Sequence, residues 1–88
     1  MANKEIILAI DDDPAVLQFM KVVCHHAAYE FHGADSGANG LELLKQLKPT
    51  AILLDVNMPE MDGLETLNQI KSEFPKLREK ALVKRKDT

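Results

Sequence analysis

Short apolar runs alternate with amphipathic segments along this chain, and this alternation limits most strongly what it can fold into. Strands are predicted at Glu5–Ile10, Tyr29–Ala34 and Ala51–Leu54, the first and third of them apolar on both faces. After each strand, apolar residues recur at three- and four-residue spacing, which is the period of an α-helix. The resulting order is βαβαβα, which predicts parallel strands joined by right-handed helical crossovers in an α/β sandwich.

The ends of the three expected helices are marked by residues suited to capping. Asp13 is expected to cap the first helix, with Pro14 at the position where a missing N–H costs nothing. Ser36 can cap the second helix, and the third is expected to begin near Asp62 and to end before Pro75. The stripes expected to face the core are Val16, Met20, Val23, Cys24 and Ala27, then Ala38, Leu41, Leu44 and Leu47, then Leu64, Leu67, Ile70 and Phe74.

Composition indicates a single small globular domain. The sequence has 88 residues, of which 45% are hydrophobic and 28% charged. A chain of this size buries only about 60–65% of the surface that its unfolded form exposes, so a partner or a dimer could complete it. The lone Cys24 excludes an internal disulfide, and no apolar run approaches the roughly 20 residues of a membrane span or the layout of a signal peptide. We therefore expect a cytoplasmic protein.

Carboxylates follow the first and third strands. The stretch "ILAIDDDP" ends in Asp11, Asp12 and Asp13, and Asp55 follows the third apolar run. Functional groups gather beyond the carboxyl ends of parallel strands, so Asp11, Asp12 and Asp55 are expected to share one pocket if these strands are neighbours. A cation would relieve the repulsion between them, and oxygen-only ligands with open positions suit Mg²⁺. Helix capping explains Asp13, but one capping residue would suffice, so we assign the other acids to a metal site.

Two stretches together resemble a known family. "ILAIDDDP" followed by "ILLDVNMPEMDG" is similar to the response-regulator receiver domain of two-component signalling, over residues 6–74. The resemblance implies a CheY-like, flavodoxin-like parallel sheet of strand order 2-1-3 between two helical layers. It also implies that Asp55 accepts a phosphoryl group from a histidine kinase or phosphotransfer protein. Mg²⁺ would be held by Asp11, Asp12, Asp55 and the backbone carbonyl of Asn57, with Asp12 the more direct ligand of the acidic pair. Met58, Pro59 and Gly63 match the loop that shapes the pocket.

The chain departs from this family toward its C-terminal end. A complete receiver has five βα units, whereas this sequence supplies three, so we interpret residues 1–75 as a truncated receiver and residues 76–88 as a basic tail or helix extension. Residues 81–83 align with the fourth strand, but they are followed by Lys-Arg-Lys, so helix or disorder is expected there. The family's Ser or Thr after the fourth strand is replaced by Arg85, and its fifth-strand Lys has no counterpart. Phosphorylation is therefore expected to switch the domain poorly.

Other functional classes have less support. A haloacid-dehalogenase-like phosphatase would need an acid at Asn57, so we do not expect an enzyme. His25, His26 and His32 are expected at the surface, and Cys24 in the core. The basic residues after Pro75 have no interleaved aromatics, so they are interpreted as solvated and not as a nucleic-acid contact.

An alternative function is a non-signalling half-receiver that acts as an interaction or dimerisation module. In the order 2-1-3 the third strand is a sheet edge, although Ala51–Leu54 is apolar on both faces and has neither the charges nor the proline that protect an edge. Part of the inner faces of the first and third helices should also be exposed, because the units that would cover them are missing. We therefore expect a homodimer, formed by pairing the third strands or by exchanging residues 75–88. The alternative is that residues 76–88 fold back and cap the sheet edge of their own chain.

Overall fold

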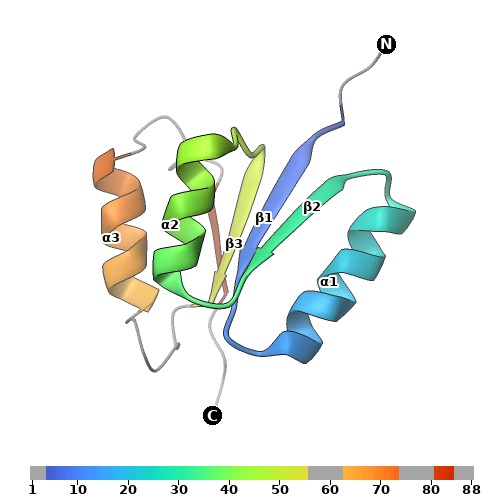
Figure 1. Ribbon diagram of the computed structural model, residues 1–88, viewed down its shortest axis with the longest axis horizontal. Coiled ribbons are helices and arrows are strands. Elements are labelled where there is room, and N and C mark those ends of the chain that lie inside the picture. The colour runs from blue at the N-terminus through green and yellow to red at the C-terminus, as the bar shows by residue number, and fades with distance from the viewer. Residues whose placement is uncertain (1–3, 56–62, 74–80, 85–88) are drawn as a thin grey trace.

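Four parallel strands form the centre of the molecule. The computed structural model describes residues 4–55, 63–73 and 81–84. The sheet has the order β2-β1-β3-β4, with every neighbouring pair parallel (Figure 1). The predicted flavodoxin-like order 2-1-3 is thus confirmed, and a fourth strand extends it. The elements are β1 (Ile6–Ile10), α1 (Pro14–His26), β2 (Glu30–Ala34), α2 (Gly37–Gln46), β3 (Ala51–Asp55), α3 (Gly63–Glu73) and β4 (Ala81–Lys84).

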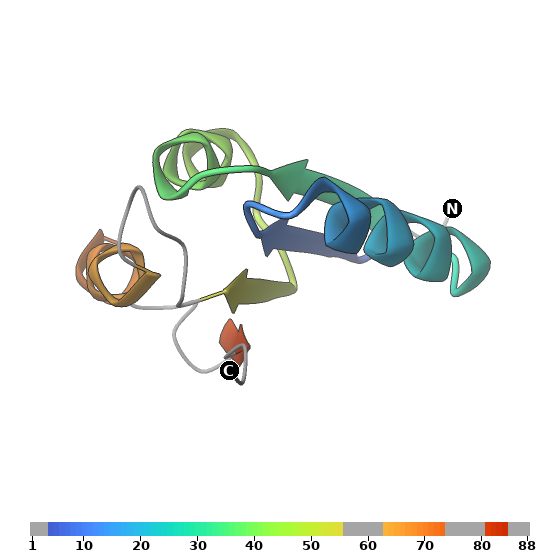
Figure 2. The same cartoon turned by 90° about the horizontal axis from the view of Figure 1, so that it is seen from below.

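The helices divide unequally between the two faces of the sheet. Helices α2 and α3 lie on one face, and α1 lies on the other, beside β1 and β2 (Figure 2). The three-layer α/β sandwich predicted from the alternation is therefore confirmed. On the α1 side, none of the described elements lies over β3 and β4.

The predicted caps of the first two helices are present, whereas Asp62, predicted near the start of the third, lies outside the described residues. The Ala15 N–H donates a hydrogen bond to Asp13 Oδ1 at 2.9 Å, with Pro14 in the first helical position of α1. The Asn39 N–H donates a hydrogen bond to Ser36 Oγ at 3.1 Å, and Ser36 directly precedes the first residue of α2. These bonds satisfy donors that a helix start leaves without an intrahelical partner, which is why the capping residues could be identified in the sequence.

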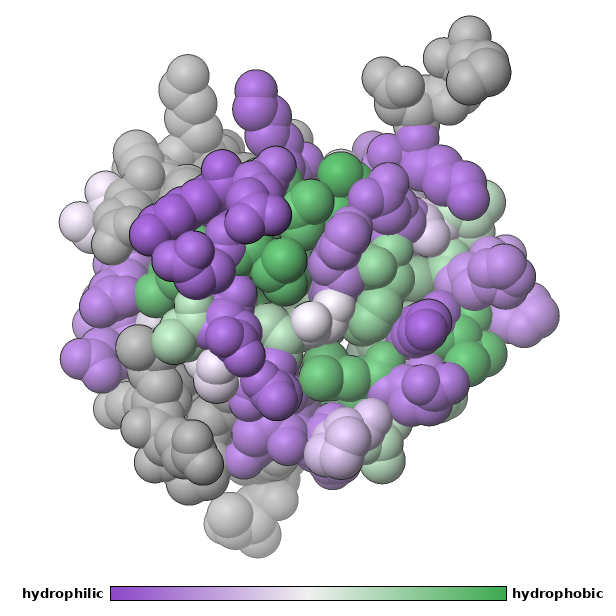
Figure 3. All heavy atoms as spheres, in the orientation of Figure 1, coloured by the Kyte–Doolittle hydropathy of each residue, from purple (hydrophilic) through white to green (hydrophobic). Residues whose placement is uncertain are grey.

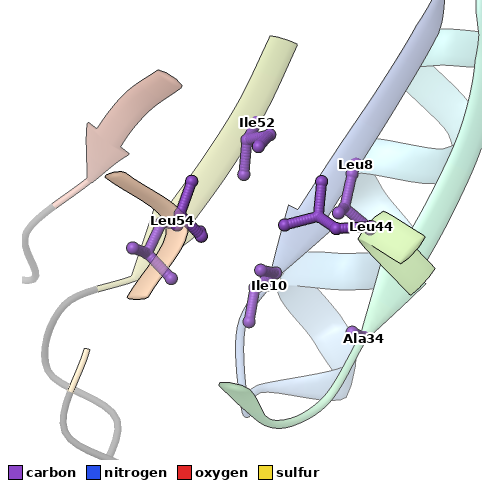
Figure 4. Packing of buried hydrophobic residues seen from close by; sticks show 7 residues of the cluster. Leu8, Ile10, Ala34, Leu44, Ile52 and Leu54 are labelled. Carbon is purple, nitrogen blue, oxygen red and sulfur yellow. The ribbon is translucent and has the colours of Figure 1, made fainter. Parts of the chain in front are cut away.

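The hydrophobic core lies between the sheet and the α2–α3 layer (Figure 4). Alternation along the strands turns Leu8 and Ile10 of β1, and Ile52 and Leu54 of β3, toward these helices. All four side chains are fully or almost fully buried. The core is completed by Ala34 of β2, Leu44 of α2 and Ile70 of α3.

The expected apolar stripes of the first two helices are only partly correct. In α1 Cys24 is buried, but Val23 and Ala27 are exposed. In α2 the buried positions are Gly37, Gly40 and Leu44, and Ala38 is exposed. Spacing identifies a helix and its period, but the width of the buried stripe depends on what the neighbouring elements cover.

The expectation of helix or disorder in the C-terminal segment was wrong for residues 81–84. These residues form β4, which pairs with β3 from Ile52 opposite Ala81 to Asp55 opposite Lys84. An uncovered β3 would have left its outer N–H and C=O groups without sheet partners, and β4 satisfies them despite its short apolar run. The third strand is therefore not the sheet edge, and the predicted dimer through paired third strands loses its premise.

Candidate functional site

Three carboxylates meet at the carboxyl ends of β1 and β3. The two strands are paired from Ile7 opposite Ala51 to Ile10 opposite Leu54, so the residues that follow this register are Asp11 and Asp55. One carboxylate oxygen from each of Asp11, Asp12 and Asp55 lies within 4.8 Å of the other two. The structure therefore brings together three of the four residues predicted to form a metal site.

The backbone at the end of β1 fixes the first of these acids. The Asp11 N–H donates to the Ala34 carbonyl oxygen at 3.0 Å, which continues the pairing of β1 with β2. The Asp13 N–H then donates to Asp11 Oδ1 at 2.9 Å. Asp13 uses its own carboxylate to cap α1. The interpretation of Asp13 as a cap, distinct from the acids of the cluster, is thus consistent with the geometry.

Burial differs among the clustered acids. Asp11 is 3% exposed and Asp55 is 1% exposed, whereas Asp12 is more open to solvent. Carboxylates this close together repel one another, and an opposite charge among them lowers that repulsion. The donor set consists of oxygen only and is open toward solvent at Asp12, which suits a hard divalent cation such as Mg²⁺.

The remaining residues of the predicted site cannot be placed in the same way. Asn57, Met58 and Pro59 lie outside the described residues, as does Arg85. Gly63 is described: it is the first residue of α3, the next described element after β3.

An apolar groove adjoins the acidic cluster. It has a volume of about 590 Å³ and includes Asp11 and Asp55 at its acidic end. Its other lining residues are apolar and come from β1, β3 and α1, namely Ala9, Leu53, Ala15, Val16, Phe19 and Met20. The expected exposure of part of the inner face of the first helix agrees with this groove, which Val16 and Met20 of the expected stripe help to line.

The other candidates singled out in the sequence lie where they were expected. His25 and His26 are exposed, and His32 Nε2 lies 2.7 Å from Glu30 Oε2 on the same strand. Cys24 is a buried residue of α1, and this burial raises the pKa of its thiol. Both findings support structural and surface roles for these residues.

One buried polar group was not anticipated. The Thr66 side chain in α3 is fully buried, and its hydroxyl has no hydrogen-bond partner among the described residues. The neighbouring Glu65 and Leu67 fit the pattern of an ordinary amphipathic helix, so the sequence did not indicate that Thr66 would be a buried polar residue.

Comparison with known sequences gives one consistent family. The model of the response regulator receiver domain matches residues 7–86. The response regulator MprA of Mycobacterium leprae is 39% identical over 66 residues, which are 75% of this chain and 29% of that protein. The nitrate/nitrite response regulator protein NarL of Escherichia coli is 43% identical over 86 residues, which are 93% of this chain and 37% of that protein. The chain thus spans about a third of the length of these relatives.

Solved structures agree with this result. A receiver domain protein (CheY-like) from Methanospirillum hungatei superposes with a TM-score of 0.89 at 26% identity, covering 98% of this chain and 67% of that one. The N-terminal domain of a receiver protein from Methanoculleus marisnigri has a TM-score of 0.79 at 35% identity, covering 89% and 63%. The response regulator TrrA from Thermotoga maritima, solved in complex with Mg²⁺-BeF, has a TM-score of 0.77 at 25% identity, covering 90% and 65%.

No helix in the described ranges is both long and apolar enough to cross a membrane.

Proposed function

Because the chain belongs to the response regulator receiver domain family, we propose that it accepts a phosphoryl group on Asp55 in two-component signalling. The donor would be a phosphohistidine of a histidine kinase or phosphotransfer protein. The observation that carries this proposal is the convergence of Asp11, Asp12 and Asp55 within 4.8 Å at the carboxyl ends of two neighbouring strands. Receiver domains are signalling modules, so we propose no enzymatic turnover, and we place the protein in the cytoplasm.

The chemistry follows from the position of Asp55. One of its carboxylate oxygens forms a bond to phosphorus while the bond between phosphorus and the donor's imidazole nitrogen breaks, and that nitrogen takes a proton. Asp55 is held at the end of β3 by its pairing with β1 and β4, so the nucleophile is already oriented by the sheet. Bound Mg²⁺ would neutralise the charge of the carboxylates and of the incoming phosphoryl oxygens. Its ligands would be Asp11, Asp12, Asp55 and the backbone carbonyl of Asn57.

Switching by phosphorylation is proposed to be impaired. The proposal rests on Arg85, which occupies the place of the Ser or Thr that would contact the phosphoryl group. We also propose that residues 1–75 belong to the receiver domain and that residues 76–88 form a basic segment. Within that segment, residues 81–84 add β4 to the sheet.

The proposal is tested by intact-mass spectrometry after incubation with acetyl phosphate and Mg²⁺. The unaltered chain should gain the mass of one phosphoryl group, and Asp55→Asn should gain none. Asp35→Asn is the matched control, because it removes an exposed carboxylate that follows β2 and lies outside the cluster. Equal labelling of the unaltered chain and Asp55→Asn would contradict the assignment. So would the absence of labelling in the unaltered chain.

The alternative is a non-signalling interaction or dimerisation module. The apolar groove beside α1 favours it, because a soluble monomer rarely leaves such a surface open. A folded chain that binds a protein partner but neither Mg²⁺ nor a phosphoryl group would support this alternative. Neither candidate function involves nucleic acid or a membrane.

A further inference from the structure

One short turn connects the acidic cluster to the start of α1. The Asp11 N–H donates a hydrogen bond to the Ala34 carbonyl oxygen at 3.0 Å, so the sheet holds this end of the turn. Asp12 comes next, and Asp13 is the N-cap of α1 with an extended backbone (φ −94°, ψ 111°). Asp12 therefore lies directly between a residue held by the sheet and a residue held by the helix.

Asp13 connects this turn to the helix through both its side chain and its backbone. Its Oδ1 accepts a hydrogen bond from the Ala15 N–H at 2.9 Å. Its carbonyl oxygen accepts hydrogen bonds from the Val16 and Leu17 N–H groups at 3.1 and 3.2 Å. Its own N–H donates to Asp11 Oδ1 at 2.9 Å. One residue thus bonds both the first turn of α1 and a carboxylate of the proposed metal site.

The turn lies at the surface of the molecule. Asp12 and Asp13 are partly exposed, and hydrophilic side chains lie around the start of α1, at the lower edge of the space-filling view (Figure 3). Because these two residues are polar and reach solvent, hydrogen bonds hold this part of the chain more than apolar packing does. An N-cap satisfies a donor that the helix start would otherwise leave without a partner, so loss of the cap allows the first turn to fray.

We propose that Asp13 is a positioning residue of the metal site, which holds the Asp12 carboxylate beside those of Asp11 and Asp55 by capping α1. This inference rests on the proposed Mg²⁺ site and gives Asp13 a role there that is separate from ligation. Asp13 acts through its cap and not through its charge. Without the cap, Asp12 samples more conformations, and the apparent affinity for Mg²⁺ falls with the fraction of molecules in which the three acids remain together.

The test is calorimetric titration of Mg²⁺ alone into the full chain and its variants. Asp13→Ala removes the acceptor of the Ala15 N–H and should weaken Mg²⁺ binding by about 3- to 10-fold, as expected for loss of one cap. This loss is smaller than the roughly 10- to 100-fold typical when the partner of a metal ligand is removed, because the N–H of position 13 remains.

Two matched variants separate the cap from charge and from general destabilisation. Asp13→Asn removes the charge but keeps a capping oxygen, so it should bind Mg²⁺ within about two-fold of the unaltered chain. Ser36→Ala removes the cap of α2, which lies outside the acidic cluster. It should lower stability as Asp13→Ala does and leave the affinity for Mg²⁺ unchanged.

A second measurement uses the unaltered chain and so does not depend on whether a variant folds. The coupling between cap and metal is reciprocal, so saturating Mg²⁺ should slow hydrogen exchange of the Ala15, Val16 and Leu17 amides by at least about 3-fold. The Asn39 amide, which bonds the cap of α2, should exchange at the same rate with and without Mg²⁺.

The possible results distinguish this inference from the metal site itself. Equal weakening by Asp13→Ala and Asp13→Asn would overturn the inference, because charge would then be responsible, and equal weakening by Ser36→Ala would overturn it as a general effect of stability. Saturable binding that is unchanged in Asp13→Ala would also overturn it, but would leave the metal site in place. An absence of saturable binding in the unaltered chain would overturn both.

Discussion

The two faces of the sheet receive similar residues from the strands but provide different surroundings. On the α2–α3 side, Leu8, Ile10, Ile52 and Leu54 are fully or almost fully buried and contact two helices. On the α1 side, Ala9 and Leu53 border an open groove, and Phe19 is two-thirds exposed. Among the described elements, the hydrophobic core therefore lies on the α2–α3 face of the sheet.

The acidic cluster lies on the open side of this division. Asp11 and Asp55 line the groove together with Ala9 and Leu53, which precede them by two residues on the same strands. The packed face holds the backbones of β1 and β3 in register, and that register positions the acids. The site therefore depends on the packed face, although it opens to the other one.

The largest expected effect is the difference in unfolding free energy between alanine variants of two neighbouring leucines of β3. Leu54→Ala should lower the free energy of unfolding by about 3–5 kcal/mol, because it leaves a cavity in the packed core. Leu53→Ala, on the same strand but facing the groove, should cost only about 1 kcal/mol. Urea unfolding at low protein concentration measures both, and complete unfolding of Leu54→Ala would agree with the account. Equal losses would show that the two faces are not different in packing.

Alanine substitutions at two glycines, one on each face of the sheet, should give a smaller difference in unfolding free energy. A Cβ at Gly40 would lie 2.7 Å from Cγ1 of Ile10, which is fully buried and cannot move away. We expect Gly40→Ala to destabilise the chain by about 1–3 kcal/mol, even though alanine favours helix. A Cβ at Gly33 would lie 3.2 Å from the ring of Phe31 and 3.4 Å from Leu17 Cδ2, both partly buried.

Gly33→Ala should change the unfolding free energy by less than about 0.5 kcal/mol, as an ordinary surface substitution does. Thermal melting of the two variants measures the contrast. A larger loss of unfolding free energy for Gly33→Ala than for Gly40→Ala would mean that the α1 face of the sheet is more closely packed than the α2–α3 face.

Much of this architecture could be predicted from the sequence, since it depends on local signals. Asp13 and Ser36 identified helix starts, and the apolar runs before Asp11 and Asp55 identified the strands whose ends meet. The role of Gly40 could not be predicted, because its contact with Ile10 depends on how closely α2 approaches β1. Partial exposure of the first helix was expected, but local spacing did not identify Phe19 as its most exposed apolar residue. The pairing of β4 agrees with what was only the alternative for residues 76–88, because it depends on which neighbour covers β3, and local spacing carries no such information.

The smallest expected effect concerns the end of α1 on the open side. Ala28 has a positive φ of 63° directly after the helix, a conformation that costs an L-residue about 1–2 kcal/mol. Ala28→Gly should therefore raise the free energy of unfolding by about 0.5 kcal/mol, after the greater chain entropy of glycine is subtracted. Ala27 has a φ of −88°, so Ala27→Gly should lower it by a similar amount. Urea titration of both variants checks the opposite signs, and two changes of the same sign would contradict the explanation.

The most direct measurement of the central claim is Mg²⁺ binding by the chain in solution, followed by isothermal titration or by NMR shifts of residues 11–13 and 55. We predict saturable binding that Asp12→Asn and Asp55→Asn each weaken by at least about 10-fold, since each removes a charged ligand. Asp13→Asn is the matched control, because asparagine caps a helix as well as aspartate does and the position lies outside the cluster. This variant should retain binding. An absence of saturable binding, or equal loss in Asp12→Asn and Asp13→Asn, would contradict the assignment of Asp11, Asp12 and Asp55 as one metal-binding phosphoacceptor site.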